Sequence, residues 1–137
     1  MKTVGIGVDI VDNKRFKNHI KDNKIRTSLF INPTSNDVIL SKELGAECVE
    51  IHTGRFANLV KSKKKTYNEL LRIKKSCRLA NKIGLEVHAG HGLDYKSTEI
   101  LSKISEIKEF NIGHFIIGES IFYGIKTVIK KFKKIIK

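Results

Sequence analysis

The sequence predicts an α/β fold in which short parallel strands alternate with helices. Apolar runs alternate along the 137 residues with longer segments whose apolar residues recur with the 3.6-residue period of a helix. Such repeats, with short connections, require parallel strands joined by right-handed crossovers. Two architectures satisfy this requirement: a doubly wound sheet, and a partial (β/α) TIM-type barrel of four to five βα units. The length suits one core, so we expect a single domain over residues 1–137.

The first part of the chain is expected to contain two strand–helix units. Residues 3–11 (TVGIGVDIV) are typical of a strand, and residues 13–21 of a short polar helix. The apolar run at residues 25–32 predicts the second strand. It ends before Pro33, because proline has no N–H group to donate to a sheet. Helix-capping side chains follow, so the next helix is expected over residues 36–44.

The middle of the chain holds the clearest helix. Residues 47–52 (ECVEIH) predict a strand, and the basic segment at residues 53–65 is expected to be a long loop that covers or binds a ligand. Residues 67–83 keep a helical period of apolar side chains and end at Gly84, a typical helix stop. Residues 85–89 predict the next strand.

The last part of the chain predicts a helix, a strand and a second helix. The first helix is expected over residues 97–104, with Ser97 as its cap, and the strand over residues 109–117, interrupted at Gly113 and His114. The final helix is strongly amphipathic, with lysines opposite an apolar face. That face consists of Ile121, Phe122, Ile125, Val128, Ile129, Phe132, Ile135 and Ile136. We expect this face to pack on the sheet, although a basic amphipathic helix can also bind membranes or nucleic acid.

The charge balance suggests an anionic partner. The chain has 27 basic and 14 acidic residues, a formal net charge of +13. A phosphorylated metabolite, a nucleic acid or a membrane surface would fit this charge, and a lysine-rich composition by itself would explain it equally well. Cys48 and Cys77 lack metal-ligand spacing and are expected to be buried free thiols. With no signal sequence at its start and no apolar run of ~18 residues, the chain is expected to be cytosolic and not to bind a membrane.

Polar residues and glycines follow the carboxyl ends of the expected strands. They are Asn32, the segment from His52 to Gly54, the segment from His88 to Gly92, and the pair Gly113–His114. Barrels and open α/β sheets both bind ligands at that edge. Glycines there let backbone N–H groups approach a phosphate, and an adjacent histidine can act as a general acid. One Gly–His pair is often only a tight turn, but two at consecutive strand ends favour a site for a phosphorylated substrate.

Glu50 is a second kind of candidate. Its side chain would point into a barrel if Val49 and Ile51 point outward. A carboxylate there is costly to bury without a partner, so Glu50 is a candidate for stabilising a cationic intermediate. A metal site would be another interpretation of the histidines, although no paired-ligand spacing supports it. Its ligands would be His52, His88, His91 and His114.

Several of these segments together resemble a known enzyme family. They are SLFINP at residues 28–33, VEIHTG at 49–54, GLEV at 84–87, AGHGL at 89–93, FNIGH at 110–114 and IIG at 116–118. From about residue 25 to residue 137, their order and spacing resemble the C-terminal half of pyridoxine 5'-phosphate synthase. The resemblance implies a (β/α) barrel with additional helices, assembled as a homo-octamer. It also implies condensation of 1-deoxy-D-xylulose 5-phosphate with 3-amino-2-oxopropyl phosphate, without a metal or organic cofactor.

The same resemblance assigns roles to five residues. His91 is similar to the proton donor of the family, and Glu50 to the carboxylate that stabilises the transition state. Gly92, Gly113 and His114 resemble the binding site for the aminooxopropyl phosphate. These are the positions at which the residues themselves indicate an acid, a buried carboxylate and a phosphate site.

The chain departs from the family at its N-terminus. The first half of the family supplies the histidine and glutamate that act as bases and most groups that hold the deoxyxylulose phosphate, and this chain has no counterpart of it. We therefore expect a truncated synthase, weak or inactive alone, that pairs as a homo-oligomer or with a complementing N-terminal half. Residues 1–18 are also similar to the start of holo-acyl-carrier-protein synthase, in which an aspartate at the position of Asp9 binds magnesium. The alternative function is a non-catalytic basic fragment that binds phosphate compounds or nucleic acid, although its basic surface lacks the aromatic residues typical of single-strand binding.

Overall fold

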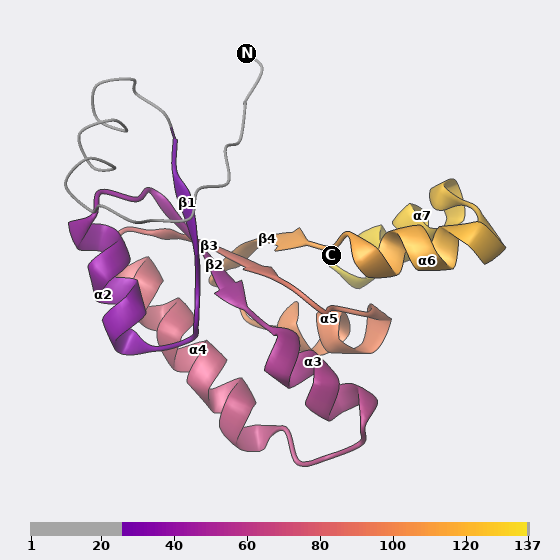
Figure 1. The fold of residues 1–137 in the computed structure, drawn as a ribbon, viewed down its shortest axis with the longest axis horizontal. Coiled ribbons are helices and arrows are strands. Elements are labelled where there is room, and N and C mark those ends of the chain that lie inside the picture. The colour runs from indigo at the N-terminus through magenta and orange to yellow at the C-terminus, as the bar shows by residue number, and fades with distance from the viewer. Residues whose placement is uncertain (1–25, 137) are drawn as a thin grey trace.

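Four parallel strands form one open sheet in a computed structural model, which describes residues 26–136 (Figure 1). The strands are β1 (Ser28–Ile31), β2 (Cys48–His52), β3 (Glu86–Gly90) and β4 (Ile107–Asn111). They lie side by side in chain order, β1-β2-β3-β4, and every neighbouring pair is parallel. This order is that of a barrel and not of a doubly wound sheet, in which the strand order reverses. The described residues therefore form a partial, unclosed (β/α) barrel of four strands.

Residues 26–136 contain six helices, two of which make most of the helix contacts with the strands. They are α2 (Ser35–Glu43), α3 (Gly54–Lys61), α4 (Tyr67–Lys82), α5 (Tyr95–Leu101), α6 (His114–Tyr123) and α7 (Ile125–Ile135). Contacts join α2 to β1, and α4 to β2 and β3. Figure 1 shows α6 and α7 side by side, projecting away from α2 and α4. The strand–helix alternation predicted from residue 25 onward is thus confirmed.

Alternation along the strands divides the sheet into a core face and an inner face. Val49, Ile51 and Ala89 have no exposed surface and belong to the cluster beneath the helices. Glu50 and His52 point the other way and are half-buried. The inner face also carries His88, which pairs in register with Glu50. The predicted orientation of Glu50, with its two neighbours pointing outward, is confirmed.

The basic segment after β2 is a helix, so the expected long loop at residues 53–65 is wrong. Helix α3 occupies Gly54–Lys61 and buries Phe56, Ala57 and Val60. Val60 lies three positions after Ala57 and four after Phe56, which places these side chains on one side of a helix. The lysines that follow, and the glycine at its start, concealed this short helical pattern.

The C-terminal elements also differ from expectation. Strand β4 ends at Asn111, and α6 begins at His114, within the segment expected to be strand. Gly124, with a φ of 75°, separates α6 from α7, so the expected single helix is two. Of its predicted apolar face, Val128 and Phe132 are buried, but α7 packs on α5 and α6 rather than on the sheet.

Smaller differences concern α5 and the first residues. Helix α5 begins two residues before Ser97, and Asp94 is its cap; Asp94 and Ser97 bond each other's backbone N–H groups. The elements expected at residues 3–11 and 13–21, with Asp9, lie outside the described residues. Cys48 and Cys77 are buried free thiols, as predicted. Between residues 26 and 136, every helix is too short or too polar to cross a membrane.

Candidate active site

The loop after β3 carries His91 and Gly92 and is held by a buried hydroxyl group. Thr53, directly after β2, is fully buried, and its Oγ1 lies 2.7 Å from the carbonyl oxygen of Gly90 and 2.9 Å from that of His91. Its backbone N–H also donates to the Gly90 carbonyl, at 2.8 Å. His91 has a φ of 76°, which is uncommon for a residue with a side chain and costs roughly 1–2 kcal/mol. Thr53 thus helps to hold His91 in a conformation that presents its imidazole to solvent.

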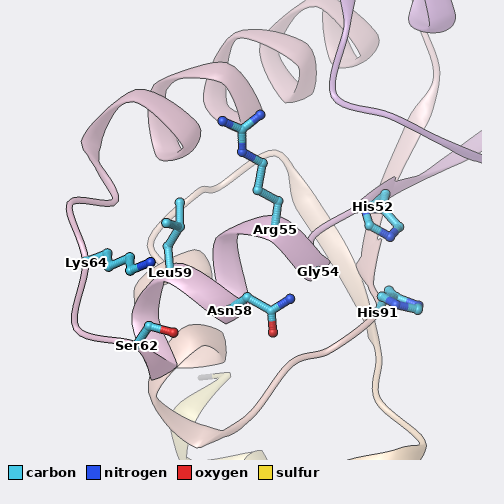
Figure 2. Close-up of a pocket in the computed structure, with 8 residues that line it drawn as sticks. All are labelled: His52, Gly54, Arg55, Asn58, Leu59, Ser62, Lys64 and His91. Carbon is cyan, nitrogen blue, oxygen red and sulfur yellow. The ribbon is translucent and has the colours of Figure 1, made fainter.

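The imidazoles of His52 and His91 stack on each other at this edge (Figure 2). Their ring centroids are 4.6 Å apart and their planes differ by 28°. The ring of Phe30 meets His52 edge-on, with centroids 5.2 Å apart. A Cβ atom on Gly54 would lie 2.7 Å from Cδ2 of His91 and 3.0 Å from Cε1 of His52, so glycine at this position leaves room for both rings.

His52 has a perturbed pKa. Burial is the main cause and lowers the pKa below its usual value, because the charged form loses solvation. The charge on His91 and on Arg72 lowers it further, whereas Glu69 and Glu50 oppose this effect. His52 therefore favours its neutral form.

A pocket of about 420 Å³ opens beside the two imidazoles (Figure 2). Helix α3 forms much of its wall, with Asn58 and Ser62, and Lys64 lies beyond the end of the helix. Figure 2 shows Arg55 pointing away from the imidazoles. Its Nε lies 3.5 Å from a carboxylate oxygen of the buried Glu69. Polar groups thus line only part of the pocket, which is otherwise apolar, and His91 lies at its border.

Glu50 has a hydrogen-bond partner on β4. The side-chain amide of Asn111 donates to Oε2 of Glu50 at 2.7 Å. The other carboxylate oxygen lies over Gly90, where any Cβ atom would overlap it. The carboxylate therefore extends across β3, one residue before His91. It is half-buried and keeps one oxygen without a hydrogen bond to the described residues.

Gly113 and His114 lie at the same edge but make fewer contacts. They follow β4, the neighbour of β3, and form the start of α6. The first N–H groups of a helix have no partner within it and favour anions. Both residues are exposed, and a Cβ atom on Gly113 would meet nothing within 4 Å. Within residues 26–136, Gly113 thus has space for a ligand, but its backbone conformation does not require glycine.

The four histidines do not form a metal-binding group among the described residues. The group of potential ligands that does form is Cys48, Glu86 and His88, whose ligand atoms lie within 4.8 Å of one another. Nε2 of His88 is 2.8 Å from Oε1 of Glu86, and the Arg26 guanidinium is 2.6 Å from the same oxygen. An arginine cation already neutralises this carboxylate.

The roles of two residues of the site were missed by sequence reasoning. Thr53 holds the loop of His91 through hydrogen bonds to residues 37 and 38 positions further along the chain. Asn111 holds Glu50, which lies 61 positions earlier. A polar residue at a strand end was the signal available for each, and this signal does not identify the partner. The predicted residues Glu50, His91 and Gly92 are brought together, and Gly113 and His114 lie on the adjacent strand end.

The chain is similar over nearly all of its length to proteins of one family. Residues 3–137 match the family model described as pyridoxal phosphate biosynthesis protein PdxJ. The chain is 55% identical over 133 residues to the pyridoxine 5'-phosphate synthase of Pelagibacter ubique, which covers 94% of this chain and 56% of that protein. The enzyme of the same name from Campylobacter fetus is 41% identical, in a match that covers 97% of this chain and 60% of that protein. The one from a Sulfurihydrogenibium species is 44% identical, in a match that covers 95% of this chain and 54% of that protein.

The chain spans a little more than half the length of these curated relatives. The family match begins at residue 3, ahead of the segment at residue 25 from which the motifs are recognised. It includes all four described strands and every predicted site residue. The chain therefore belongs to the PdxJ family of pyridoxal phosphate biosynthesis proteins.

Proposed function

We propose that this chain supplies the C-terminal half of a pyridoxine 5'-phosphate synthase site. The reaction would condense 1-deoxy-D-xylulose 5-phosphate with 3-amino-2-oxopropyl phosphate. The names of the relatives support this activity for their full-length chains, of which this chain matches a part. The observation that carries the proposal is the exposed imidazole of His91, held at positive φ directly after Gly90, over which the carboxylate of Glu50 lies.

The phosphate of the aminooxopropyl substrate would bind between the ends of β3 and β4. Gly92 and Gly113 can offer backbone N–H groups, and α6 directs its N-terminal dipole to the same edge. His114, the first residue of α6, is exposed and can donate a further hydrogen bond. With its dianionic phosphate bound here, the substrate would extend its carbon chain toward the inner face of the sheet.

His91 and Glu50 would act on that carbon chain. Joining an amine to a ketone releases water and passes through a cationic imine. The carboxylate of Glu50 stabilises such a cation, and Asn111 fixes its direction. His91 donates a proton to the departing hydroxyl group, since within residues 26–136 its ring nitrogens make no hydrogen bond that would compete.

The proposed site also needs a partner. The inner face carries the carboxylates of Glu50, Glu86 and Glu109, together with His88 and Arg26. A second copy closing the barrel would bring three more carboxylates but only one more arginine to this face, whereas an N-terminal half with basic residues would neutralise the excess negative charge. We favour the complementing half over a homo-oligomer for this reason. Substrates with charged phosphates do not cross membranes unaided, so the proposed reaction would take place in the compartment where they are made, and we propose that this is the cytoplasm.

The experiment mixes the purified chain with the separately expressed N-terminal half of the Pelagibacter ubique enzyme. Formation of pyridoxine 5'-phosphate from both substrates is measured by chromatography. We expect product from the mixture, little from either half alone, and a loss of about 10²-fold or more in the mixture with His91→Gln. The Lys130→Ala variant, on the exposed side of α7, is the matched control and should keep its activity. A mixture that forms a stable complex but no product would contradict the proposal.

A further inference from the structure

We propose that His52 is a positioning residue for His91: its ring stacks against the His91 imidazole and fixes the direction from which the proton is donated. This inference rests on the proposed role of His91 and adds a residue to that site. His52 would not itself touch the reacting atoms. Its contribution is to reduce the rotamers that His91 can adopt.

The side chain of His91 has few other restraints. It is exposed, and its loop leaves the sheet at positive φ. Within residues 26–136 its ring makes no hydrogen bond, and its ring contacts are the stack on His52 and a more distant approach to Phe30, at 6.1 Å between centroids. An exposed side chain without such contacts would populate several staggered rotamers. The stack is therefore the main contact that orients the ring.

His52, by contrast, is well anchored. It ends β2 between Ile51 and Thr53, both without exposed surface, so its backbone is fixed by the core. Phe30 from β1 contacts its ring edge-on. Gly54 follows two residues later, and its missing Cβ provides the space that both imidazoles occupy. A strand anchored in the core thus presents one flat ring to the exposed imidazole of His91.

The electrostatics of the pair fit this division of roles. The pKa of His52 is lowered by burial first and then by the charge of His91, with Arg72 acting in the same direction and Glu69 and Glu50 in the opposite one. His52 thus favours its neutral form. It does not compete for the role of proton donor, which falls to the more exposed ring.

Spectroscopy on the whole chain tests the proposal without any need for activity. The five histidine side chains are observed by NMR in the wild type and in His52→Ala and His52→Phe. Loss of the stacked ring in His52→Ala should shift the His91 ring signals toward those of a free histidine, whereas His52→Phe keeps a flat ring and should preserve much of the shift. In His91→Gln, the pKa of His52 should rise. Unchanged His91 signals in His52→Ala, with amide spectra showing intact folds, would overturn the proposal.

Kinetics of the assembled enzyme supply the second test. Misplacing a reacting group by about 1 Å can cost up to ~10²-fold in rate, so we expect His52→Ala to lower kcat about tenfold or more with little change in KM. His52→Phe should retain most of kcat. Equal losses in the two variants would mean that the imidazole acts chemically, and the positioning role would be wrong. An inactive wild-type assembly would contradict the proposed function, and the NMR result alone would then decide this inference.

Discussion

At the scale of single residues, the candidate site depends on small groups that hold larger ones. The hydroxyl of Thr53 restrains the loop of His91, the amide of Asn111 restrains Glu50, and the missing side chain of Gly54 leaves room for two rings. None of these three groups would carry out chemistry itself. They reduce the conformations open to the residues that are proposed to do so, which lowers the entropy lost when substrate binds.

Replacing Thr53 tests this restraint directly. Thr53→Val keeps the shape of the side chain but leaves the carbonyl oxygen of His91 without its hydroxyl partner. We expect a loss of about 1–3 kcal/mol in the free energy of unfolding, measured by urea denaturation. Thr53→Ser keeps the hydroxyl and should lose less. Equal stability of the valine variant and the wild type would show that the hydroxyl contributes nothing to the loop.

At the scale of elements, α6 and α7 are the least supported part of the fold. Helix α6 has no buried residue, and its Ile121 and Phe122 are 78% and 79% exposed. Helix α7 is held by Val128 and Phe132, and Phe132 meets the rings of Tyr95 and Phe115. The turn between the two helices therefore has a large influence on how they pack.

Replacing each of two glycines in this region with alanine should change the free energy of unfolding in opposite directions. Gly124 has φ 75° and ψ 138°, which is strained for any residue with a Cβ atom, so Gly124→Ala should destabilise the chain by roughly 1–3 kcal/mol. Gly118 lies inside α6 with nothing near its Cβ position. Gly118→Ala should therefore stabilise the helix by up to about 1 kcal/mol. Urea denaturation measures both, and equal effects would argue against the described turn.

At the scale of the whole molecule, helices cover one face of the sheet, whereas no described element covers the other. The core face is continuous, with Val49, Ile73 and Val87 among its members. The inner face is lined by charged and polar groups and ends in two edge strands that each have one described neighbour. Half of a barrel can thus form a complete core on its helical side, while its proposed site needs a second half.

The thiol of Cys77 reports on the integrity of this core. Burial raises its pKa to about 12, so the reactive thiolate form is scarce at pH 8. In the Cys48→Ser variant, which leaves this single cysteine, iodoacetamide should hardly label the native chain at pH 8. Labelling should appear together with the loss of helical circular dichroism as urea is added. Rapid labelling in native buffer would show that the half-barrel opens frequently when alone.

The sequence by itself determined the strand–helix alternation, the direction of each side chain along β2, and the edge at which polar residues gather. These features are local: a side chain's face follows from the strand period of two, and strand ends follow from glycine and proline. Tertiary structure alone decided that Thr53 bonds the His91 loop, that Asn111 bonds Glu50 and that the rings of His52 and His91 stack. It also decided that α6 stays exposed. The physical reason is that such contacts join distant positions through the register of parallel strands, which no local pattern specifies.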